Sequence, residues 1–445
     1  PTGQVIEYVY REDGQRDTVS DGVQTLQYTY DEFDQSTGSI GFSGLGVATT
    51  RPAVGQTATN WYGPFSQSLQ TLVDASGVLE TVNGLEPIHS APDVLSTVVG
   101  GLTLHHPEDV GVVDRVEMGN SEEIIERSEL GMTGHVLTIG GVERFVETPV
   151  MDENGRIESL SENVFGTGRD LGFGYDVMGR LNEVYQDGVL AQAYSYDQNG
   201  ARLSSLESDV WVDYTYDAQD RLTTMGDVAF AYDAEGNRVK ATAPGGVTLY
   251  RYDPLGNLVR VDLPDGRVVE YLVDGDGRRV AKRVDGQLVR RWVFNGAQIV
   301  AELDGNGAIL SRFVWAPGGP VAMKQGANWY RIVRDHLGSV RAVVAVQNDV
   351  VLQSIEYGPY GRVLSDSNPG FQPFGFAGGI YDSDTALVQF GAREYDALSG
   401  TWTRKDPIRF LGGDNFYEYA KSDPVNFFDP TGFSPCSGQS FTSQH

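Results

Sequence analysis

Carboxylates near the C-terminal end of the chain are the side chains whose types and spacing could do chemistry. Asp406 and Asp429 each precede a proline, and Glu394 directly follows Arg393. Two carboxylates that share one proton can hydrolyse a peptide, because one activates water while the other protonates the carbonyl oxygen or the leaving nitrogen. An arginine could orient a carboxylate or polarise the carbonyl group. The sequence does not decide whether Asp429 or Glu394 pairs with Asp406, since all three are expected on separate turns or strands.

The same aspartates also have a purely structural interpretation. Asp-Pro commonly opens a turn, and the chain has four such steps, at Asp253, Asp406, Asp423 and Asp429. From the residue types alone, each of the four is a turn residue. A catalytic interpretation therefore needs support from the surrounding sequence.

Other kinds of site have weaker signals. His105, His106 and His135 lack the cysteine or carboxylate spacing of a metal site. The Gly-Asp-Gly at residues 275–277 is not part of an EF-hand loop. The chain has no Gly-x-Ser-x-Gly elbow or phosphate-binding glycine loop, and its single cysteine, Cys436, excludes an internal disulfide. We therefore expect no cofactor and no metal.

Acidic side chains dominate the charge of the molecule. The chain has 33 Lys and Arg against 61 Asp and Glu, a formal net charge of −28. Such a field repels nucleic acid and anionic bilayers, so neither is expected as a partner. No apolar run of 18 residues occurs, and no membrane span is expected.

A short repeated phrase organises the middle of the chain. It reads aromatic–x–Tyr–Asp, followed by a glycine or aspartate and then Arg or Asn with an apolar residue. Two rings that are two residues apart fall on one face of a strand, Asp starts a turn, and Gly supplies a positive φ. Each copy is therefore predicted to be a β-hairpin, and stacked copies are predicted to form a long curled sheet. The tyrosines of the copies are Tyr175, Tyr196, Tyr216, Tyr232, Tyr252 and Tyr271.

These repeats predict an all-β chain, which divides into four parts. Residues 1–165 carry only traces of the phrase and are predicted to form a degenerate portion of the same shell, and residues 166–330 form the repeat shell proper. The remaining division, into a C-terminal segment at residues 331–433 and a tail at residues 434–445, is what the family resemblance described below implies. Only short helices are expected, around residues 121–130 and 415–421.

A series of motifs in the C-terminal segment makes a family resemblance specific. In order they read RDHLGSVR at 334–341, YGPYG at 357–361, GAREYD at 391–396 and DPIRFLGGDNFYEYAKSDPVNFFDPTGF at 406–433. This run resembles the Rhs repeat-associated core domain, and the repeats resemble the YD repeats of Rhs proteins, of toxin-complex C components and of teneurins. Arg409 and Asp423 depart from the family, which usually has Gly and Asn there. His336, inside the first motif, is expected to make structural hydrogen bonds.

The resemblance implies a hollow β-shell, closed by the core segment, that holds the protein's own C-terminal toxin as cargo. It implies an aspartyl-type autoprotease that cuts between Phe433 and Ser434, with Asp406 as the first catalytic candidate. The tail is then a cleaved remnant or the truncated start of a toxin. A delivery or shell-completing protein is a further expected partner, and the expected location is secreted or cell-surface, through bacterial export or contact-dependent delivery.

Two other functions remain open at this stage. One is a catalytically inactive structural or adhesive shell, as in teneurins. The other is a glycan-binding scaffold that uses exposed Tyr and Trp side chains. Cleavage after Phe433 would separate the toxin-encapsulating function from both.

Overall fold

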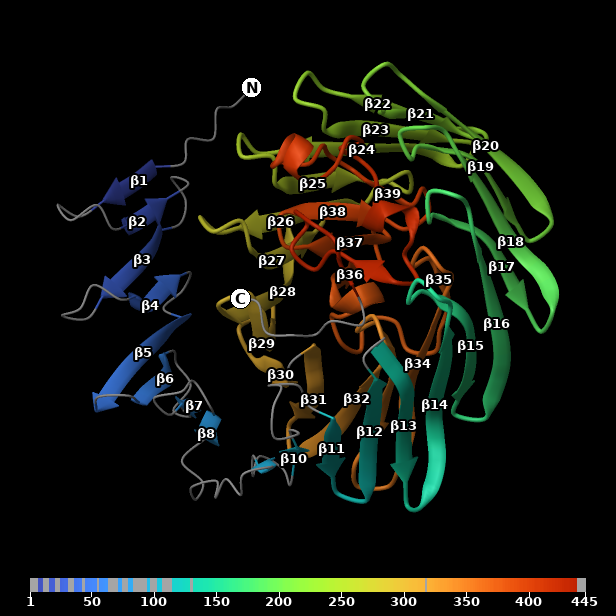
Figure 1. Cartoon of the computed structure of the whole chain (residues 1–445). Coiled ribbons are helices and arrows are strands. Elements are labelled where there is room, and N and C mark those ends of the chain that lie inside the picture. The colour runs from blue at the N-terminus through green and yellow to red at the C-terminus, as the bar shows by residue number, and fades with distance from the viewer. Residues whose placement is uncertain are drawn as a thin grey trace.

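β-strands make up almost all of the regular structure, which confirms the all-β prediction. The computed structural model describes residues 114–437, apart from residues 129, 130 and 317, and before residue 114 it describes ten strands. A long antiparallel sheet curls around the C-terminal segment (Figure 1). The predicted curled shell is therefore present, and the core segment lies inside its curve.

The first eight strands form a sheet of their own in chain order. They are β1 (Glu7–Tyr10), β2 (Arg16–Ser20), β3 (Thr25–Tyr30), β4 (Ser36–Gly41), β5 (Leu45–Ala53), β6 (Gln56–Tyr62), β7 (Thr71–Val73) and β8 (Leu79–Val82). The side chains of these strands lie outside the described residues, so the predicted degenerate repeats among them are not tested.

The curled sheet contains 27 strands, β9 to β35, and each pairs with the next along the chain. It begins with β9 (Val94–Ser96), β10 (Leu102–His105), β11 (Arg115–Met118), β12 (Ser121–Ser128), β13 (Gly131–Ile139), β14 (Val142–Met151) and β15 (Ile157–Val164). The repeat strands are β16 (Thr167–Tyr175), β17 (Leu181–Gln186), β18 (Val189–Tyr196), β19 (Arg202–Glu207), β20 (Val210–Tyr216), β21 (Leu222–Met225), β22 (Val228–Tyr232), β23 (Arg238–Ala243), β24 (Gly246–Tyr252), β25 (Leu258–Asp262), β26 (Val268–Val273) and β27 (Arg279–Val284). It ends with β28 (Gln287–Asn295), β29 (Gln298–Asp304), β30 (Ile309–Ala316), β31 (Gly319–Gln325), β32 (Asn328–Arg334), β33 (Val340–Ala345), β34 (Val351–Tyr357) and β35 (Val363–Asp366).

The core segment is built from short elements. A four-stranded sheet contains β36 (Ile380–Asp382), β37 (Leu387–Phe390), β38 (Arg393–Asp396) and β39 (Thr401–Trp402), and β40 (Phe427–Phe428) pairs with β41 (Cys436–Ser437). Three 3-10 turns complete it: η2 (Phe376–Gly378), η3 (Arg409–Leu411) and η4 (Ala420–Ser422). One sequence prediction was wrong, because residues 121–128 form β12 rather than a helix. At the start of β12 every second side chain is buried, as expected for a strand, and these side chains are Ser121 and Glu123.

Each repeat turn is held by its own aspartate. In the first, Asp176 Oδ1 accepts the N–H groups of Met178 and Arg180, and its Oδ2 accepts Arg180 Nε at 2.7 Å. Gly179 supplies the positive φ of 83°. An aspartate that caps its own turn and pairs with the following Arg fixes the hairpin locally, which is why the repeat could be read from the sequence.

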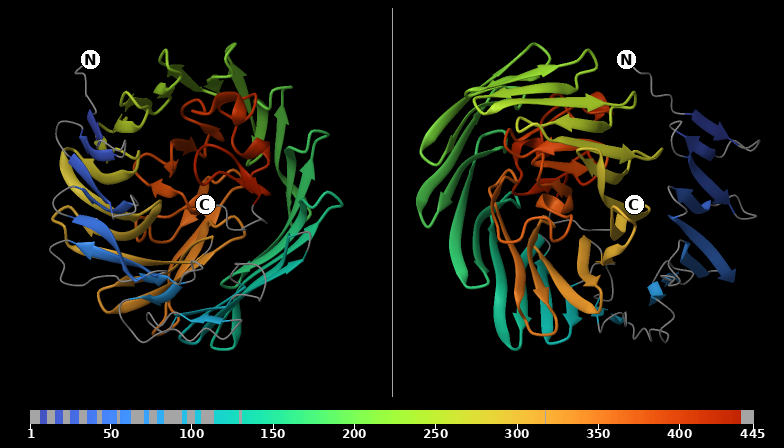
Figure 2. Two further views of the ribbon diagram at one scale, coloured as in Figure 1. Left: turned by 60° about the vertical axis from the view of Figure 1, so that its left-hand side comes forward. Right: turned by 180° about the vertical axis from the view of Figure 1, so that it is seen from behind.

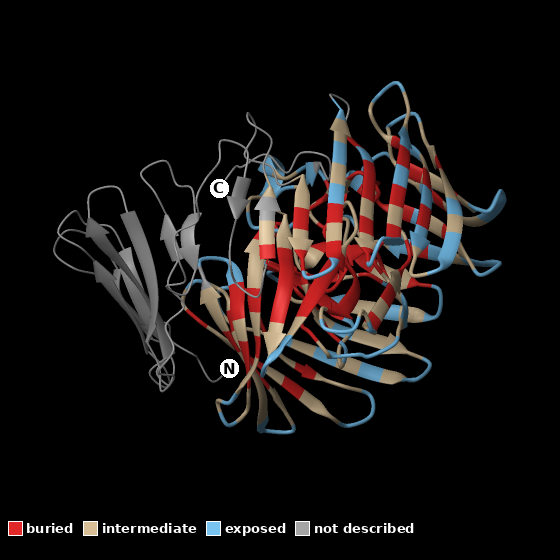
Figure 3. Cartoon of the chain, turned by 90° about the horizontal axis from the view of Figure 1, so that it is seen from below, coloured by how far each residue is buried: buried red, intermediate tan, exposed pale blue. Residues whose placement is uncertain are grey.

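The residue five positions after each turn aspartate points to the inside of the curl and is buried. It alternates between leucine and arginine along six successive repeats: Leu181, Arg202, Leu222, Arg238, Leu258 and Arg279. Figure 3 shows such buried positions in red along the strands. The leucines fill the wall, whereas the arginines reach the core segment.

Buried ion pairs join the wall to the core segment. Arg238 contacts Asp396, and it also donates to Thr401 Oγ1 at 3.1 Å. Arg279 contacts Glu394 at 3.2 Å. A buried charge must be paired to be tolerated, so these pairs fix where the core segment docks on the repeat turns.

A second buried ion network joins the early wall strands to the late ones. Glu123 on β12 pairs with Arg331 on β32. Glu147 on β14 accepts the backbone N–H of His336 at 3.1 Å, and its carboxylate lies 3.6 Å from His135 Nδ1. The two groups of strands, β12–β15 and β31–β33, lie close together in both views of Figure 2. His336 Nε2 also contacts the carbonyl oxygen of Val425 at 2.9 Å, which matches the structural role expected for it.

This network predicts that alkaline pH destabilises the fold. Burial opposes the charge on both histidines. Glu123 and Glu147 outweigh it at His135. Glu147 and Asp335 outweigh it at His336, so the pKa of each histidine is raised to about 9. A folded-state pKa above the unfolded value of 6.5 means that the stabilisation is complete below pH 6.5 and is lost as pH rises through 9. We expect the free energy of unfolding to fall by about 1–3 kcal/mol across that window. Chemical denaturation at a series of pH values measures it, and a flat profile would contradict the network.

Candidate active site

Arg393 gathers the two aspartates that the sequence singled out. It lies at the start of β38, and its side chain is 2 % exposed. Its Nη2 contacts Asp406 Oδ2 at 2.8 Å and Asp429 Oδ2 at 3.2 Å. Its Nε donates to the carbonyl oxygen of Gly432, and the guanidinium lies 4.0 Å from the centroid of the Trp402 ring. One cation thus positions two carboxylates and the main chain just before Phe433.

Asp406 is both a turn residue and a buried acid. Its Oδ1 accepts the backbone N–H of Ile408 at 2.8 Å, as expected of an Asp-Pro turn, and its own N–H donates to the Phe416 carbonyl oxygen. The residue is only 4 % exposed. Burial raises the pKa of Asp406, the nearby charge of Asp429 raises it further, and Arg393 opposes both. Such a group can keep a proton more readily than an ordinary aspartate.

Asp429 holds the backbone of Phe433. Its Oδ1 accepts the N–H of Phe433 and the hydroxyl of Thr431, each at 3.1 Å. Gly432 lies between them with a positive φ of 69°, and a Cβ on it would lie 2.4 Å from the Phe390 carbonyl oxygen. Only glycine fits this close approach, so the Asp-Pro-Thr-Gly turn packs Gly432 against the core sheet and leaves the Phe433 side chain exposed.

The carbonyl group of Phe433 lies next to Asp406. A Cβ built on Gly412 would lie 2.6 Å from Asp406 Oδ2 and 3.2 Å from the Phe433 carbonyl oxygen. The two oxygens therefore border the same small space and are at most about 6 Å apart. This upper limit is compatible with a carboxylic acid and a carbonyl group linked directly or through one water molecule.

Glu394, the third carboxylate candidate, is not part of this cluster. Neighbouring residues on a strand point to opposite faces, so Glu394 points away from the side that Arg393 occupies. Its carboxylate pairs with Arg279 of the wall. The structure thus places Asp429, rather than Glu394, beside Asp406.

The chain beyond Phe433 is held as well. Cys436 and Ser437 form β41, which pairs with Phe428 and Phe427 of β40. The Phe433–Ser434 bond therefore lies between two segments that are each held by hydrogen bonds, and Ser434 itself is exposed. Sequence reasoning missed this anchor, because a two-residue strand leaves no periodic signal.

Two further features considered for this chain are a metal-ligand cluster and a membrane-spanning helix. No group of three or more His, Cys, Asp or Glu side chains is arranged to hold a metal ion there. No helix in the part of the chain that the structure describes has the length and apolar character needed to cross a bilayer.

Comparison with known proteins identifies the family. The family model described as Teneurin YD-shell matches residues 118–425, more than half of the chain. The chain belongs to the teneurin YD-shell family. This match confirms the resemblance to YD-repeat proteins that the sequence motifs indicated.

Curated relatives of the YD-shell chain include both teneurins and an Rhs protein. Teneurin-3 of Danio rerio is 32% identical over 306 residues, which covers 62% of this chain and 11% of that protein. The protein named Probable deoxyribonuclease RhsA of Dickeya dadantii is 27% identical over 286 residues, 60% of this chain and 19% of that protein. The chain therefore spans only one tenth to one fifth of these relatives.

A solved structure shares the fold of the YD-shell chain. The crystal structure of TcdB2-TccC3-TEV superposes with a TM-score of 0.69 at 14% identity, over 96% of this chain and 25% of that one. At this identity the likeness concerns the fold, and it supports the curled shell.

Gly412 offers a steric test of the site. Its backbone is right-handed helical (φ −89°, ψ −14°), so alanine is tolerated there, but the added Cβ would lie 2.6 Å from Asp406 Oδ2. We expect Gly412→Ala to displace the Asp406 carboxylate and to slow any cleavage at Phe433 roughly 100-fold, without unfolding the chain. Intact mass spectrometry follows the cleavage. Gly245→Ala is the matched control, since a Cβ there meets nothing within 4 Å; equal rates for the two variants would contradict the placement of Asp406.

Proposed function

We propose that this chain is a YD-repeat shell that encapsulates its own C-terminal toxin and releases it by aspartyl-type autoproteolysis after Phe433. The observation that supports this most strongly is the buried trio of Arg393, Asp406 and Asp429 around the Phe433 backbone. One arginine is thus shared by two carboxylates beside the main chain at the proposed cleavage bond.

The proposed reaction uses the two aspartates as a proton-sharing pair. Asp429 takes a proton from a water molecule whose oxygen attacks the Phe433 carbonyl carbon, and Asp406 donates its proton to the carbonyl oxygen. The tetrahedral intermediate collapses as Asp429 passes its proton to the Ser434 nitrogen, Asp406 takes back a proton from a hydroxyl of the intermediate, and the C–N bond breaks. The products are a carboxylate on Phe433 and an amine on Ser434. Arg393 keeps both carboxylates in place and lowers their mutual repulsion.

The encapsulation proposal rests on the position of this bond. The core segment lies inside the curve of the sheet (Figure 1), so polypeptide that follows Ser434 would begin within the shell. We propose a secreted or surface-delivered protein, with a delivery or shell-completing protein as partner.

The experiment that tests this function is a mass measurement of the purified chain. We expect two species, one ending at Phe433 and one beginning at Ser434, which separate only after denaturation because β41 stays paired with β40. An intact chain that is correctly folded would refute autoproteolysis.

A non-catalytic shell is the second candidate. The 32% identity to Teneurin-3 favours it, and it predicts that the Phe433–Ser434 bond persists indefinitely in the folded protein. The same mass measurement therefore separates the two functions.

A further inference from the structure

Arg202 differs from the other buried arginines of the described residues in having no carboxylate partner. Six arginines of this part of the chain are buried, and five of them pair with a glutamate or aspartate within ion-pair distance: Arg238, Arg279, Arg331, Arg341 and Arg393. Arg202 is 5 % exposed, and no ion pair involves it among the described residues. A buried cation without a counter-charge is unfavourable, so its environment calls for an explanation.

Arg202 occupies the same repeat position as Arg238 and Arg279. Those two reach carboxylates of the core segment, Asp396 and Glu394. Arg202 instead meets the core at Gly400, where a Cβ would lie 2.4 Å from its Nη2. Three tyrosine rings surround the guanidinium, with Tyr360 at 3.8 Å, Tyr194 at 4.9 Å and Tyr214 at 5.6 Å. Aromatic faces offset only part of the cost of burying a charge.

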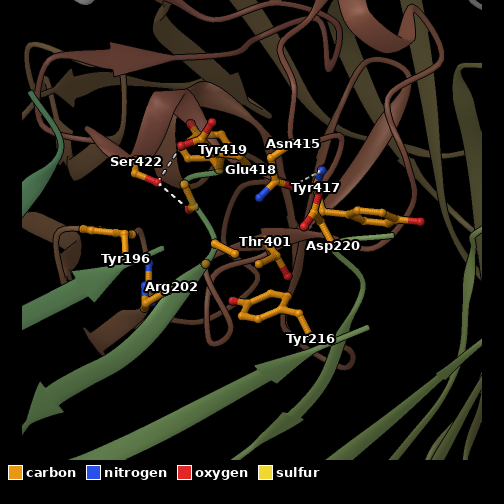
Figure 4. A pocket seen from close by; sticks show the side chains of 13 residues that line it. Tyr196, Arg202, Tyr216, Asp220, Thr401, Asn415, Tyr417, Glu418, Tyr419 and Ser422 are labelled. Carbon is orange, nitrogen blue, oxygen red and sulfur yellow. Dashed lines mark hydrogen bonds between the residues drawn. The ribbon is translucent and has the colours of Figure 1, made fainter. Parts of the chain in front are cut away.

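A small pocket lies between Arg202 and the core segment (Figure 4). Its volume is about 20 Å³, enough for a water molecule or a monatomic ion. Repeat-shell residues such as Tyr216 line one side, and core residues such as Thr401 and Asn415 line the other. The pocket therefore lies at the interface between the repeat wall and the core segment.

Hydrogen-bond donors without partners line this pocket. The Nε of Arg202 and the hydroxyl of Tyr216 are buried and make no hydrogen bond with the described residues. The oxygen of Asn415 accepts the N–H of Tyr417 at 3.0 Å, and its amide nitrogen points into the space (Figure 4). A site with a cation and several free donors is chemically complementary to an anion.

Two acidic side chains also line the pocket, Asp220 from the repeat wall and Glu418 from the core segment (Figure 4). Glu418 Oε1 accepts the hydroxyl of Ser422 at 2.8 Å, and burial raises the pKa of Glu418 to about 7. Near neutral pH, its neutral form is accessible, so it need not repel an anion beside Arg202.

We propose that this pocket binds a single chloride ion, which neutralises Arg202 and completes the third arginine contact between the repeat wall and the core segment. At the other two contacts, Arg238 and Arg279 pair with carboxylates of the core segment, whereas at this contact Arg202 binds an anion from solution. The inference is independent of the autoproteolysis proposed above, because Arg202 belongs to the wall and none of the cleavage residues lines the pocket.

Bromide provides a direct probe of the site. Crystals of the whole chain would be soaked in sodium bromide and measured at the bromine absorption edge. We expect an anomalous peak between Arg202, Tyr216 and Asn415. Water density in the pocket without an anomalous signal would overturn the proposal.

Thermal unfolding provides the second test, with a variant that the repeats themselves suggest. Leucine stands at the equivalent position of neighbouring repeats, at Leu181, Leu222 and Leu258, so Arg202→Leu should be accepted by the wall. We expect the Tm of the wild type to be roughly 2–4 °C higher in chloride than in gluconate, a much larger anion, at equal ionic strength. Arg202→Leu should abolish that difference, and an undiminished difference would refute the site.

A second variant covers the case in which Arg202→Leu fails to fold. Tyr216→Phe removes only one donor and keeps the buried cation. We expect it to reduce the chloride-dependent Tm shift by about half. An unchanged shift in Tyr216→Phe would contradict chloride binding in this pocket.

Discussion

Asp406→Asn is expected to leave the Phe433–Ser434 bond whole through expression, folding and purification. The amide keeps the shape of the side chain but cannot take part in proton transfer, which is worth about 10²–10⁴ in rate for a general acid or base. Asp406 borders the same small space as the Phe433 carbonyl oxygen, so its loss removes the proton donor that the proposed reaction requires. Intact mass spectrometry of the purified variant should show one undivided chain.

Asp423→Asn is the matched control for that variant. Asp423 also precedes a proline, is 1 % exposed, and has its pKa raised by burial to about 6. Its carboxylate accepts hydrogen bonds from Asn426 rather than from Arg393. We expect this variant to be cut as fully as the wild type. If Asp423→Asn were as inactive as Asp406→Asn, the loss would reflect misfolding of the core segment, and the assignment of Asp406 would fail.

The second large effect concerns stability, and it is expected for Glu147→Gln. Glu147 is fully buried and faces His135, His336 and, at 4.0 Å, Arg341. Burial raises the pKa of Glu147, but His135 and His336 outweigh it and lower the pKa far below its usual range. Replacing the charge leaves buried cations uncompensated, which costs about 3–5 kcal/mol. The midpoint of guanidinium denaturation, followed by tryptophan fluorescence, measures this loss.

Glu143→Gln serves as the control for Glu147→Gln. Both glutamates lie on β14, but Glu143 is exposed. An exposed substitution of this kind changes the free energy of unfolding by about 0.5 kcal/mol or less. Equal midpoints for the two variants would mean that the buried network does not hold the early and late wall strands together.

The fold could be predicted from the sequence because the contacts that form each hairpin lie within a few residues of one another. Each turn aspartate accepts hydrogen bonds from residues two and four positions later, and the glycine before the return strand takes the positive φ. These contacts span fewer than about six residues, so a repeated phrase predicts a repeated hairpin. The alternation of leucine and arginine after the turns was also present in the sequence, although it was not recognised there.

The candidate site was readable only in part. The motifs pointed to Arg393, Asp406 and Asp429, which the structure brings together. The choice between Asp429 and Glu394 was left open, although Arg393 and Glu394 are neighbours in a predicted strand and must face opposite ways. The alternation of side chains along the strand was therefore enough to predict that Glu394 lies outside the site of Arg393.

Long-range contacts could not be predicted in this way. Glu123 and Arg331 are 208 residues apart in the chain, and they meet only because the sheet curls through the intervening strands. The twist accumulated over many hairpins decides which wall strands face each other. No local pattern marks either residue as a partner of the other.

The most direct test of the central claim is to synthesise the chain in a cell-free system in water enriched in heavy oxygen. If the aspartate pair activates water, the fragment that ends at Phe433 will carry one heavy oxygen in its new carboxylate, and Asp406→Asn will yield no such fragment. A folded wild-type chain that stays intact, or a cut at another bond, would contradict the account.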